Sequence, residues 1–141
     1  MVNETLTIRG DLVVSLNGEQ VLEKKNLIVN AGKNFLASAV INTSSSPFSY
    51  MAIGTGTTAA AVGDTALGSE VARSVFTSSS IASNVVTLST TYAAGTGTGA
   101  LTEAGILNAS SGGTLLSRVV FSAINKGASD SLTIVWTITV G

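Results

Sequence analysis

The chain of 141 residues contains no cysteine and no histidine. Without cysteine it has neither a disulfide nor a thiolate metal ligand. Without histidine it lacks the side chain that most often acts as a general base or binds a metal. These absences remove most of the common catalytic and metal-binding arrangements, so we expect no cofactor and no metal site.

Charged residues are also scarce, at 11% of the chain against about 25% in typical soluble domains. Seven basic and eight acidic residues give a net charge of −1, so the basic face of a nucleic-acid-binding protein is not expected. A surface poor in charge is what subunits bury when they assemble. We therefore expect an oligomer or a component of a larger particle, with a Ser/Thr-rich monomer as the alternative.

Long apolar runs are missing as well. None approaches the roughly 20 residues needed to span a bilayer, so we expect no membrane contact. The first residues, MVNET, lack the basic and apolar regions of a signal peptide. We expect a protein that is made and assembled in the cytoplasm.

The clearest pattern that is present lies near the end of the chain, in Leu132–Val140 (LTIVWTITV). Every second residue from Leu132 is large and apolar, and the residues between are Thr or Val. Side chains alternate between the two faces of a strand. The pattern therefore predicts a core strand with the only tryptophan, Trp136, at its centre.

Shorter extended runs separated by turn sequences precede this strand. Asn17-Gly18 predicts a type I′ hairpin, 31–41 predicts a short helix capped by Asn30, and 78–84 predicts a turn around Ile81. The whole pattern predicts an all-β fold, an antiparallel, jelly-roll-like β-sandwich of about eight or nine strands with one short helix. We expect one domain over 1–141, with an N-terminal arm or hairpin within 1–29.

A long connection, Gly54–Gly68, follows one predicted strand. Its spacing at Gly54, Gly56 and Ala59 matches G-x-G-x-x-A, a dinucleotide-binding fingerprint that also requires a helix within a βαβ unit. Gly63 would interrupt that helix, and the rest of the chain predicts antiparallel pairing. We therefore interpret the segment as a flexible or assembly-contacting loop.

Acidic residues are scattered and form no calcium-binding run. A general acid–base pair needs two carboxylates brought together, and no spacing indicates one, so we expect no enzymatic activity. Glu103 lies among apolar residues on a predicted strand, and Arg73 and Arg118 lie at or in strands. A buried or subunit-interface ion pair is one interpretation, and surface exposure is the other.

Three stretches carry a resemblance: 51–73 (MAIGTGTTAAAVGDTALGSEVAR), 101–118 (LTEAGILNASSGGTLLSR) and 121–141 (FSAINKGASDSLTIVWTITVG). They resemble small structural proteins of tailed bacteriophages. Members of that group resemble two kinds of virion component: β-sandwich decoration (cement) proteins that sit as trimers on capsids, and tail-fibre or appendage modules. The similarity covers the last two-thirds of the chain, and residues before Phe48 match only loosely.

The resemblance implies a structural virion protein on the capsid surface, assembled in the host cytoplasm. Its expected partners are the major capsid protein and further copies of itself, as a homotrimer. The alternative is a tail-fibre or baseplate module that binds a host-surface glycan or another tail protein. Trp136, Tyr50 and Tyr92 could line a sugar-binding surface, although core packing is favoured for them.

Capsid or subunit contacts are expected in the N-terminal segment or in the long loop. The candidate residues are Leu6, Ile8, Arg9, Leu12, Val14, Thr55, Thr57 and Asp64. A carboxylate-based glycan hydrolase that uses Glu103 or Asp64 is a third and less favoured hypothesis.

Overall fold

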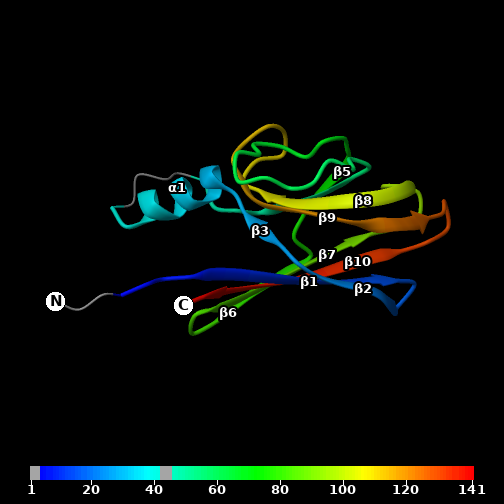
Figure 1. The fold of residues 1–141 in the computed structure, drawn as a ribbon. Helices are drawn as coiled ribbons and strands as arrows, with labels where there is room; N and C mark the ends of the chain where they lie inside the picture. Colours follow the sequence, from blue (N-terminus) through cyan, green and yellow to red (C-terminus); the bar gives the residue numbers. More distant parts are fainter. Residues whose placement is uncertain (1–3, 42–45) are drawn as a thin grey trace.

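The computed structural model describes residues 4–41 and 46–141. Sheet A contains β1 (Ile8–Leu16), β2 (Glu19–Lys25), β6 (Ser78–Ala82), β7 (Val85–Tyr92) and β10 (Leu132–Val140). Sheet B contains β3 (Leu27–Ile28), β4 (Tyr50–Gly54), β5 (Glu70–Val75), β8 (Gly99–Leu107) and β9 (Leu115–Lys126). The two sheets pack face to face (Figure 1), with strand orders β2-β1-β10-β7-β6 and β3-β9-β8-β4-β5. The predicted antiparallel β-sandwich is confirmed.

Strand β10 lies in the middle of sheet A, as its alternating sequence predicts. Its apolar row, with Trp136 fully buried at the centre, faces sheet B. Along one side it pairs with β1 from Ile8 opposite Val140 to Leu16 opposite Leu132. The first and last strands of the chain therefore form one continuous ladder.

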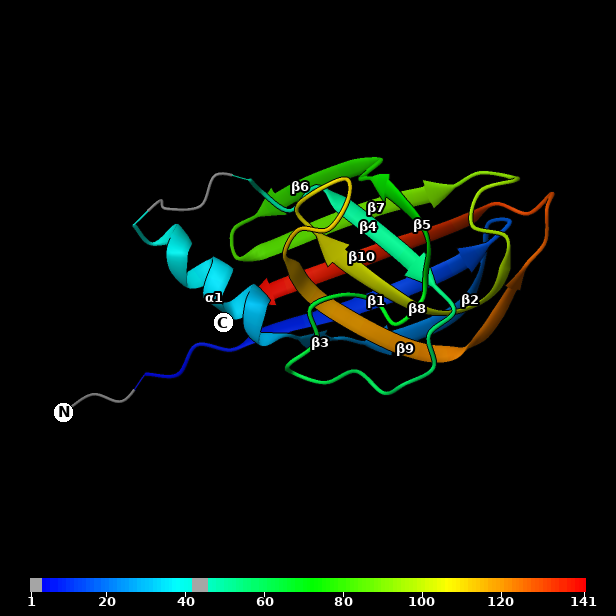
Figure 2. The same cartoon turned by 90° about the horizontal axis from the view of Figure 1, so that it is seen from above.

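Apolar residues are buried on both faces of sheet B. Its inner face packs against sheet A through residues such as Met51, Ile53 and Ile106. On its outer face a second cluster forms under the helix and the long loop, from Val29, Ala52, Leu67, Leu107 and Leu115. Figure 2 shows the loop running over β8 and β9. Within the part of the chain that the structure describes, both faces of sheet B are covered, whereas only the inner face of sheet A is.

The only helix in the described residues, α1 (Asn30–Ala39), differs slightly from the predicted one. Asn30 is its first residue and not its cap, because the N-cap position is Val29, which makes no capping side-chain bond. A Cβ on Gly32 would lie 2.4 Å from the carbonyl oxygen of Leu116. The glycine that weakens the helical signal thus allows the helix to approach β9 closely.

The turns agree with the sequence at one hairpin and differ at another. Asn17 and Gly18 have φ values of 52° and 83°, as a type I′ turn requires. The turn predicted over 78–84 is wrong, because Ser78–Ala82 forms β6 and the chain turns only at Ser83 and Asn84. The sequence of β6, SSSIA, has no alternation of apolar and polar residues. The strand therefore forms because it pairs with β7. The described residues form ten strands, against the eight or nine predicted.

The N-terminal segment combines a hairpin with an extended end. Strands β1 and β2 form the hairpin and belong to sheet A. Residues 4–7 precede β1 and have no strand pairing. Residues 1–3 of the predicted arm lie outside the described residues.

Candidate functional site

A buried ionic cluster lies beneath the loop 55–69, on the outer face of sheet B. We call it the Glu103 cluster, and it consists of Glu103 on β8, Arg118 on β9 and Asp64 in the loop. Neighbouring positions of β8 and β9 bring the first two together, since Glu103 pairs with Val120 and Gly105 with Arg118. The cluster therefore joins two strands to the loop that covers them.

Glu103 is fully buried, at 0% exposure. Its Oε1 accepts hydrogen bonds from the backbone N–H groups of Gly56 (2.9 Å) and Ser69 (2.7 Å). Its Oε2 accepts one from Gly68 N–H (2.8 Å) and one from Arg118 Nε (2.9 Å). One carboxylate thus holds both ends of the loop.

Arg118 extends the cluster to the middle of the loop. Its Nη1 lies 2.9 Å from Asp64 Oδ2, and its Nη2 donates to the carbonyl oxygen of Thr58 (2.9 Å). The same Asp64 oxygen accepts the backbone N–H of Ala61 (2.9 Å). A guanidinium suits this place because its planar fork of donors can serve several acceptors at once.

The pKa values of the cluster shift toward its charged forms. Burial alone would raise the pKa of Glu103, but hydrogen bonds from Ser69, Gly68, Arg118 and Gly56 outweigh it and lower the pKa. The pKa of Asp64 is lowered mainly by the N–H of Ala61, against a smaller opposing effect of burial and with help from Arg118. Burial opposes the charge of Arg118, yet Asp64 and Glu103 raise its pKa. All three groups are therefore ionised at neutral pH.

These contacts assign the cluster a stabilising role. Both Glu103 oxygens are engaged inside the protein, and Arg118 is 3% exposed. The buried ion pair considered from the sequence is therefore confirmed for Glu103 and Arg118. Arg73 forms a second clamp, with Glu70 (2.6 Å) and with the carbonyl oxygens of Ala109 and Gly112 (2.8 Å each).

The glycines of the G-x-G-x-x-A spacing serve this cluster. A Cβ on Gly56 would lie 2.5 Å from Glu103 Oε1, and one on Gly54 would lie 2.6 Å from the same atom. No helix follows them, since residues 55–69 are all described and form a loop. The glycines thus let the backbone approach a carboxylate of the chain itself.

The residues proposed from the sequence as contacts do not gather in one place. Leu12 and Val14 are fully buried in the core and are not available at the surface. Leu6, Arg9, Thr55 and Thr57 are exposed, and Ile8 is half-buried. Asp64 is half-buried and already bound to Arg118. The exposed ones are split between the N-terminal segment and the loop over sheet B.

Two of the three aromatic residues considered for sugar binding are core residues. Trp136 and Tyr92 are buried between the sheets. The hydroxyl of Tyr92 donates to the carbonyl oxygen of Met51. Only Tyr50 is partly exposed.

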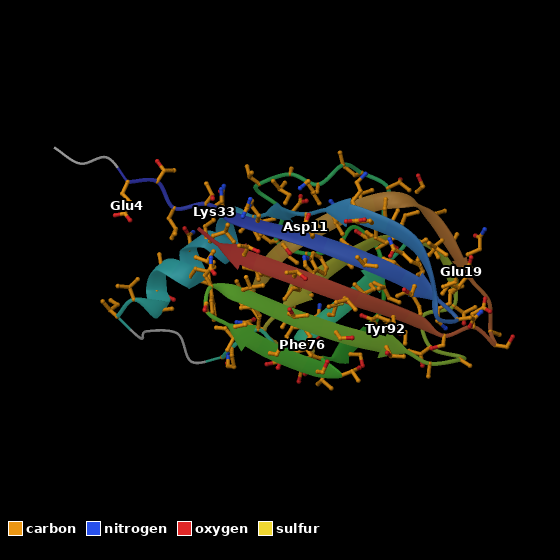
Figure 3. The ribbon with its side chains drawn as sticks, turned by 90° about the horizontal axis from the view of Figure 1, so that it is seen from below. Glu4, Asp11, Glu19, Lys33, Phe76 and Tyr92 are labelled. Atoms are coloured by element: carbon orange, nitrogen blue, oxygen red, sulfur yellow. The ribbon has the colours of Figure 1, made fainter. Side chains whose placement is uncertain are left out.

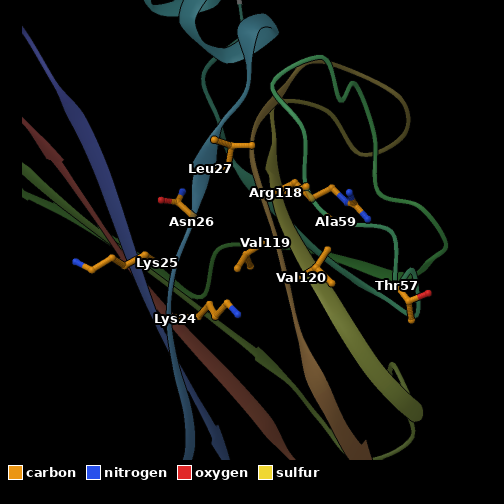
Figure 4. Close-up of a pocket in the computed structure, with 10 residues that line it drawn as sticks. Lys24, Lys25, Asn26, Leu27, Thr57, Ala59, Arg118, Val119 and Val120 are labelled. Carbon is orange, nitrogen blue, oxygen red and sulfur yellow. The ribbon is translucent and has the colours of Figure 1, made fainter.

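A depression of about 320 Å³ lies between the end of β2 and the loop (Figure 4). Lys24, Lys25 and Arg118 are its basic lining residues. Arg118 is already neutralised within the cluster, and Lys25 lies 3.5 Å from Asp11. Little uncompensated charge remains there to attract an anion.

The outer face of sheet A has a different character. Over β10, β7 and β6 it is made only of hydroxyl and small apolar side chains, which we call the Ser/Thr face. Cross-strand register places the following residues on it: Thr133, Val135, Thr137, Thr139, Val85, Thr87, Ser89, Thr91, Ser78, Ser80 and Ala82. Figure 3 shows that no helix or loop of the described residues covers this sheet from below. Arg9, Asp11 and Lys25 lie on the adjoining β1–β2 side of the sheet, where Arg9 is opposite Thr139 and Asp11 is opposite Thr137.

An apolar groove of about 320 Å³ runs along the inner side of β6. Its apolar lining residues are Phe48, Phe76, Ile81, Val86 and Leu88. Three of them, Phe48, Val86 and Leu88, also line an adjoining cavity of about 180 Å³ that reaches Leu36 of α1. The sandwich is therefore open along this edge.

In the described residues, no group of three or more acidic side chains could hold a metal ion. The helix in that part of the chain is not long and apolar enough to cross a membrane. Comparison with family models, with curated proteins and with solved structures gave no match to this chain.

Proposed function

We propose that this chain is a structural virion protein of a tailed bacteriophage, a decoration (cement) protein that binds the assembled capsid and stabilises it. The observation that carries the proposal is the Ser/Thr face, which is wide, uncovered and free of charge. Burial of such a surface costs less than burial of a charged one, because no ionised group has to be removed from water and the hydroxyl groups can hydrogen-bond to a partner. Its proposed partner is the major capsid protein.

The residues behind the phage resemblance support the proposal in a second way. Gly54, Gly56 and Asp64 come from the first of the three stretches, and Glu103 and Arg118 come from the second. Residues far apart in sequence thus meet in the Glu103 cluster. The residues that carry the resemblance therefore fix a loop onto a rigid sheet, which is a structural role.

The mechanism is linkage by mass action. A protein that binds the assembled shell and not the free subunits stabilises the shell by about 2.7 kcal/mol per site at a concentration 100 times Kd. A rigid sandwich keeps the entropy loss on binding low. No bond is made or broken, and no cofactor is required.

The first experiment locates the protein in particles produced by the genome that encodes it. Mass spectrometry and a particle reconstruction would measure its copy number and its position. Many copies spread over the shell are expected. A few copies confined to the tail would overturn the capsid proposal and favour a tail module that binds a glycan, although the burial of Trp136 and Tyr92 weighs against sugar stacking.

The second experiment tests the face itself. Thr87 and Ser89 lie on β7, the middle strand of the face, so the double variant Thr87→Arg/Ser89→Arg places two charges at its centre. We expect a folded protein that no longer binds shells lacking it. Val40→Arg, at a highly exposed site beyond α1, is the matched control and should bind normally. Undiminished binding of the double variant would assign the capsid contact to another surface.

A further inference from the structure

Among the edge strands of the described residues, only β6 lacks the features that prevent the addition of another strand. It reads Ser78–Ala82 (SSSIA), and all five residues are exposed. It has no charge and no proline, and its pairing with β7 has no register shift. An exposed edge of this kind is a template for another strand.

The other three edges carry the usual protective features. Strand β2 bears Glu19, Glu23, Lys24 and Lys25. Strand β5 bears Glu70 and Arg73 and has a register shift against β4. Strand β3 is only two residues long. Proteins block edges by charge, irregularity and shortness, so the open edge at β6 indicates that a strand pairs there.

The apolar groove beside β6 indicates which side chains an added strand needs. Ile81 is 73% exposed and lines the groove with Phe76 and Val86. Ser79 pairs with Leu88, and Ile81 pairs with Val86, so both lie on the groove side of the strand. A strand added to β6 would place every second side chain over the groove. It should present an apolar residue there and small polar residues on the other face.

The N-terminal arm, residues 4–7, has this pattern. Leu6 lies between Thr5 and Thr7 and is 70% exposed. The arm continues the direction of β1 beyond the sheet, and the carbonyl oxygen of Thr7 accepts the N–H of Gly141. It is an extended segment with no strand beside it in the described residues.

The arm cannot reach β6 of its own molecule. Strands β10 and β7 separate β1 from β6, so a strand added outside β6 lies four strand spacings from β1, roughly 19 Å. Four extended residues span at most about 14 Å, and the arm leaves the sheet along the axis of β1. Figure 2 shows β1, from which the arm leaves, separated from β6 by β10 and β7. The strand that fits β6 therefore comes from a second copy.

We propose that the arm of one copy adds antiparallel to β6 of a second copy. Leu6 then enters the groove beside Ile81, and Thr5 and Thr7 extend the Ser/Thr face. The contact joins two different surfaces, so it is heterologous and closes into a ring when the rotation between copies allows it. It does not depend on the capsid proposal.

The decisive experiment mixes two variants that each lack one half of the contact. Leu6→Asp removes the apolar anchor, and Ile81→Lys blocks the edge with a charge, both at exposed sites that leave the fold intact. Each variant alone should be monomeric by sedimentation. Mixed, they should form a one-to-one dimer, because the Ile81→Lys copy keeps its arm and the Leu6→Asp copy keeps its edge. Val75→Lys on β5 should associate like the natural chain.

A disulfide trap identifies the neighbours directly, because the chain has no cysteine of its own. Leu6→Cys mixed with Ile81→Cys or Ser79→Cys should cross-link more than Leu6→Cys with Val75→Cys, since a disulfide needs Cβ atoms about 4 Å apart. The proposal is overturned if cross-linking is equal in all mixtures, or if the natural chain stays monomeric at every concentration. It is also overturned if Ile81→Cys cross-links mainly to itself, because two β6 edges would then pair with each other.

Discussion

Glu103 is the buried charge on which the loop over sheet B depends. Four donors surround it, three of them backbone N–H groups from the two ends of the loop. A buried ion pair is weak as a source of stability compared with apolar packing, but the removal of one partner leaves the other charge uncompensated. Loss of the Glu103 carboxylate should therefore both release the ends of the loop and leave Arg118 without its buried partner.

Glu103→Gln is predicted to lower the free energy of unfolding by about 3–5 kcal/mol. The amide keeps the shape but turns an NH₂ group toward donors, and it leaves Arg118 with only Asp64 as a charged partner. Urea unfolding measures the change. Asp64→Asn, at a more exposed member of the same cluster, should lose less, and an equal loss in both variants would contradict this ranking.

The lowered pKa of Glu103 also predicts a pH dependence. In the unfolded chain this carboxyl titrates at its ordinary value of 4.5, and in the folded protein it titrates lower. Between these two values the unfolded state binds more protons, so the free energy of unfolding rises with pH. Stability should be complete above pH 4.5 and fall as the pH decreases further. Asp64, lowered from 3.8, adds to the fall.

Unfolding midpoints measured from neutral pH to about pH 3 test this dependence. Glu103→Gln should show a shallower decline than the natural chain, because one of the responsible carboxyls is gone. Parallel curves for the two proteins would show that other groups control the acid response.

At the scale of elements, two glycines of the loop 55–69 differ in how closely the backbone approaches other atoms. Gly56 has no room for a side chain against Glu103, whereas a Cβ on Gly63 would meet nothing within 4 Å. Gly56→Ala should cost about 1–3 kcal/mol through forced displacement of the carboxylate. Gly63→Ala should be neutral or stabilise by up to about 1 kcal/mol, because it restricts the unfolded chain.

Thermal unfolding and limited proteolysis within the loop report on both variants. Faster cleavage in Gly56→Ala than in Gly63→Ala is expected. If Gly56→Ala leaves the loop protected, then the contact between Gly56 and Glu103 does not hold the loop.

Strands differ in how far the sequence predicts them, and the reason is where their stability comes from. Strand β10 is specified by its own alternation, because each apolar residue is buried on one face. Strand β6 has no such signal and forms because β7 offers a ladder of hydrogen bonds. The sequence predicts the end of the helix to within two residues but not its cap, since Val29 occupies the N-cap position and makes no capping bond.

At the scale of the whole molecule, the two ends of the chain depend on each other. Strand β10 lies between β1 and β7, so truncation after Ser131 would split sheet A and expose the core. We predict that this truncated chain does not fold, as judged by far-UV circular dichroism and by the absence of a cooperative transition. The double variant Glu4→Gly/Thr5→Gly should leave the fold intact, because residues 4–7 have no strand pairing. A cooperatively folded chain that ends at Ser131 would contradict this account of the sandwich.

The two sheets differ in how their outer faces are covered. The outer face of sheet B is covered by α1 and the clamped loop, whereas no described helix or loop covers that of sheet A (Figure 3). We expect partners to approach sheet A and its β6 edge. Both proposals place binding there, away from most of the residues that the sequence suggested.

The sequence by itself determined the fold class, the central strand with Trp136, the Asn-Gly hairpin and a long loop, because alternation and turn chemistry act over a few neighbouring residues. It also contained the glycines and charges of the Glu103 cluster, but not their meeting, since Gly56, Glu103 and Arg118 come from strands and loops far apart in the chain. Only the tertiary structure decided which of the predicted contact residues are buried. Only pairing in space left β6 as an open edge, because the freedom of an edge depends on which strands lie beside it.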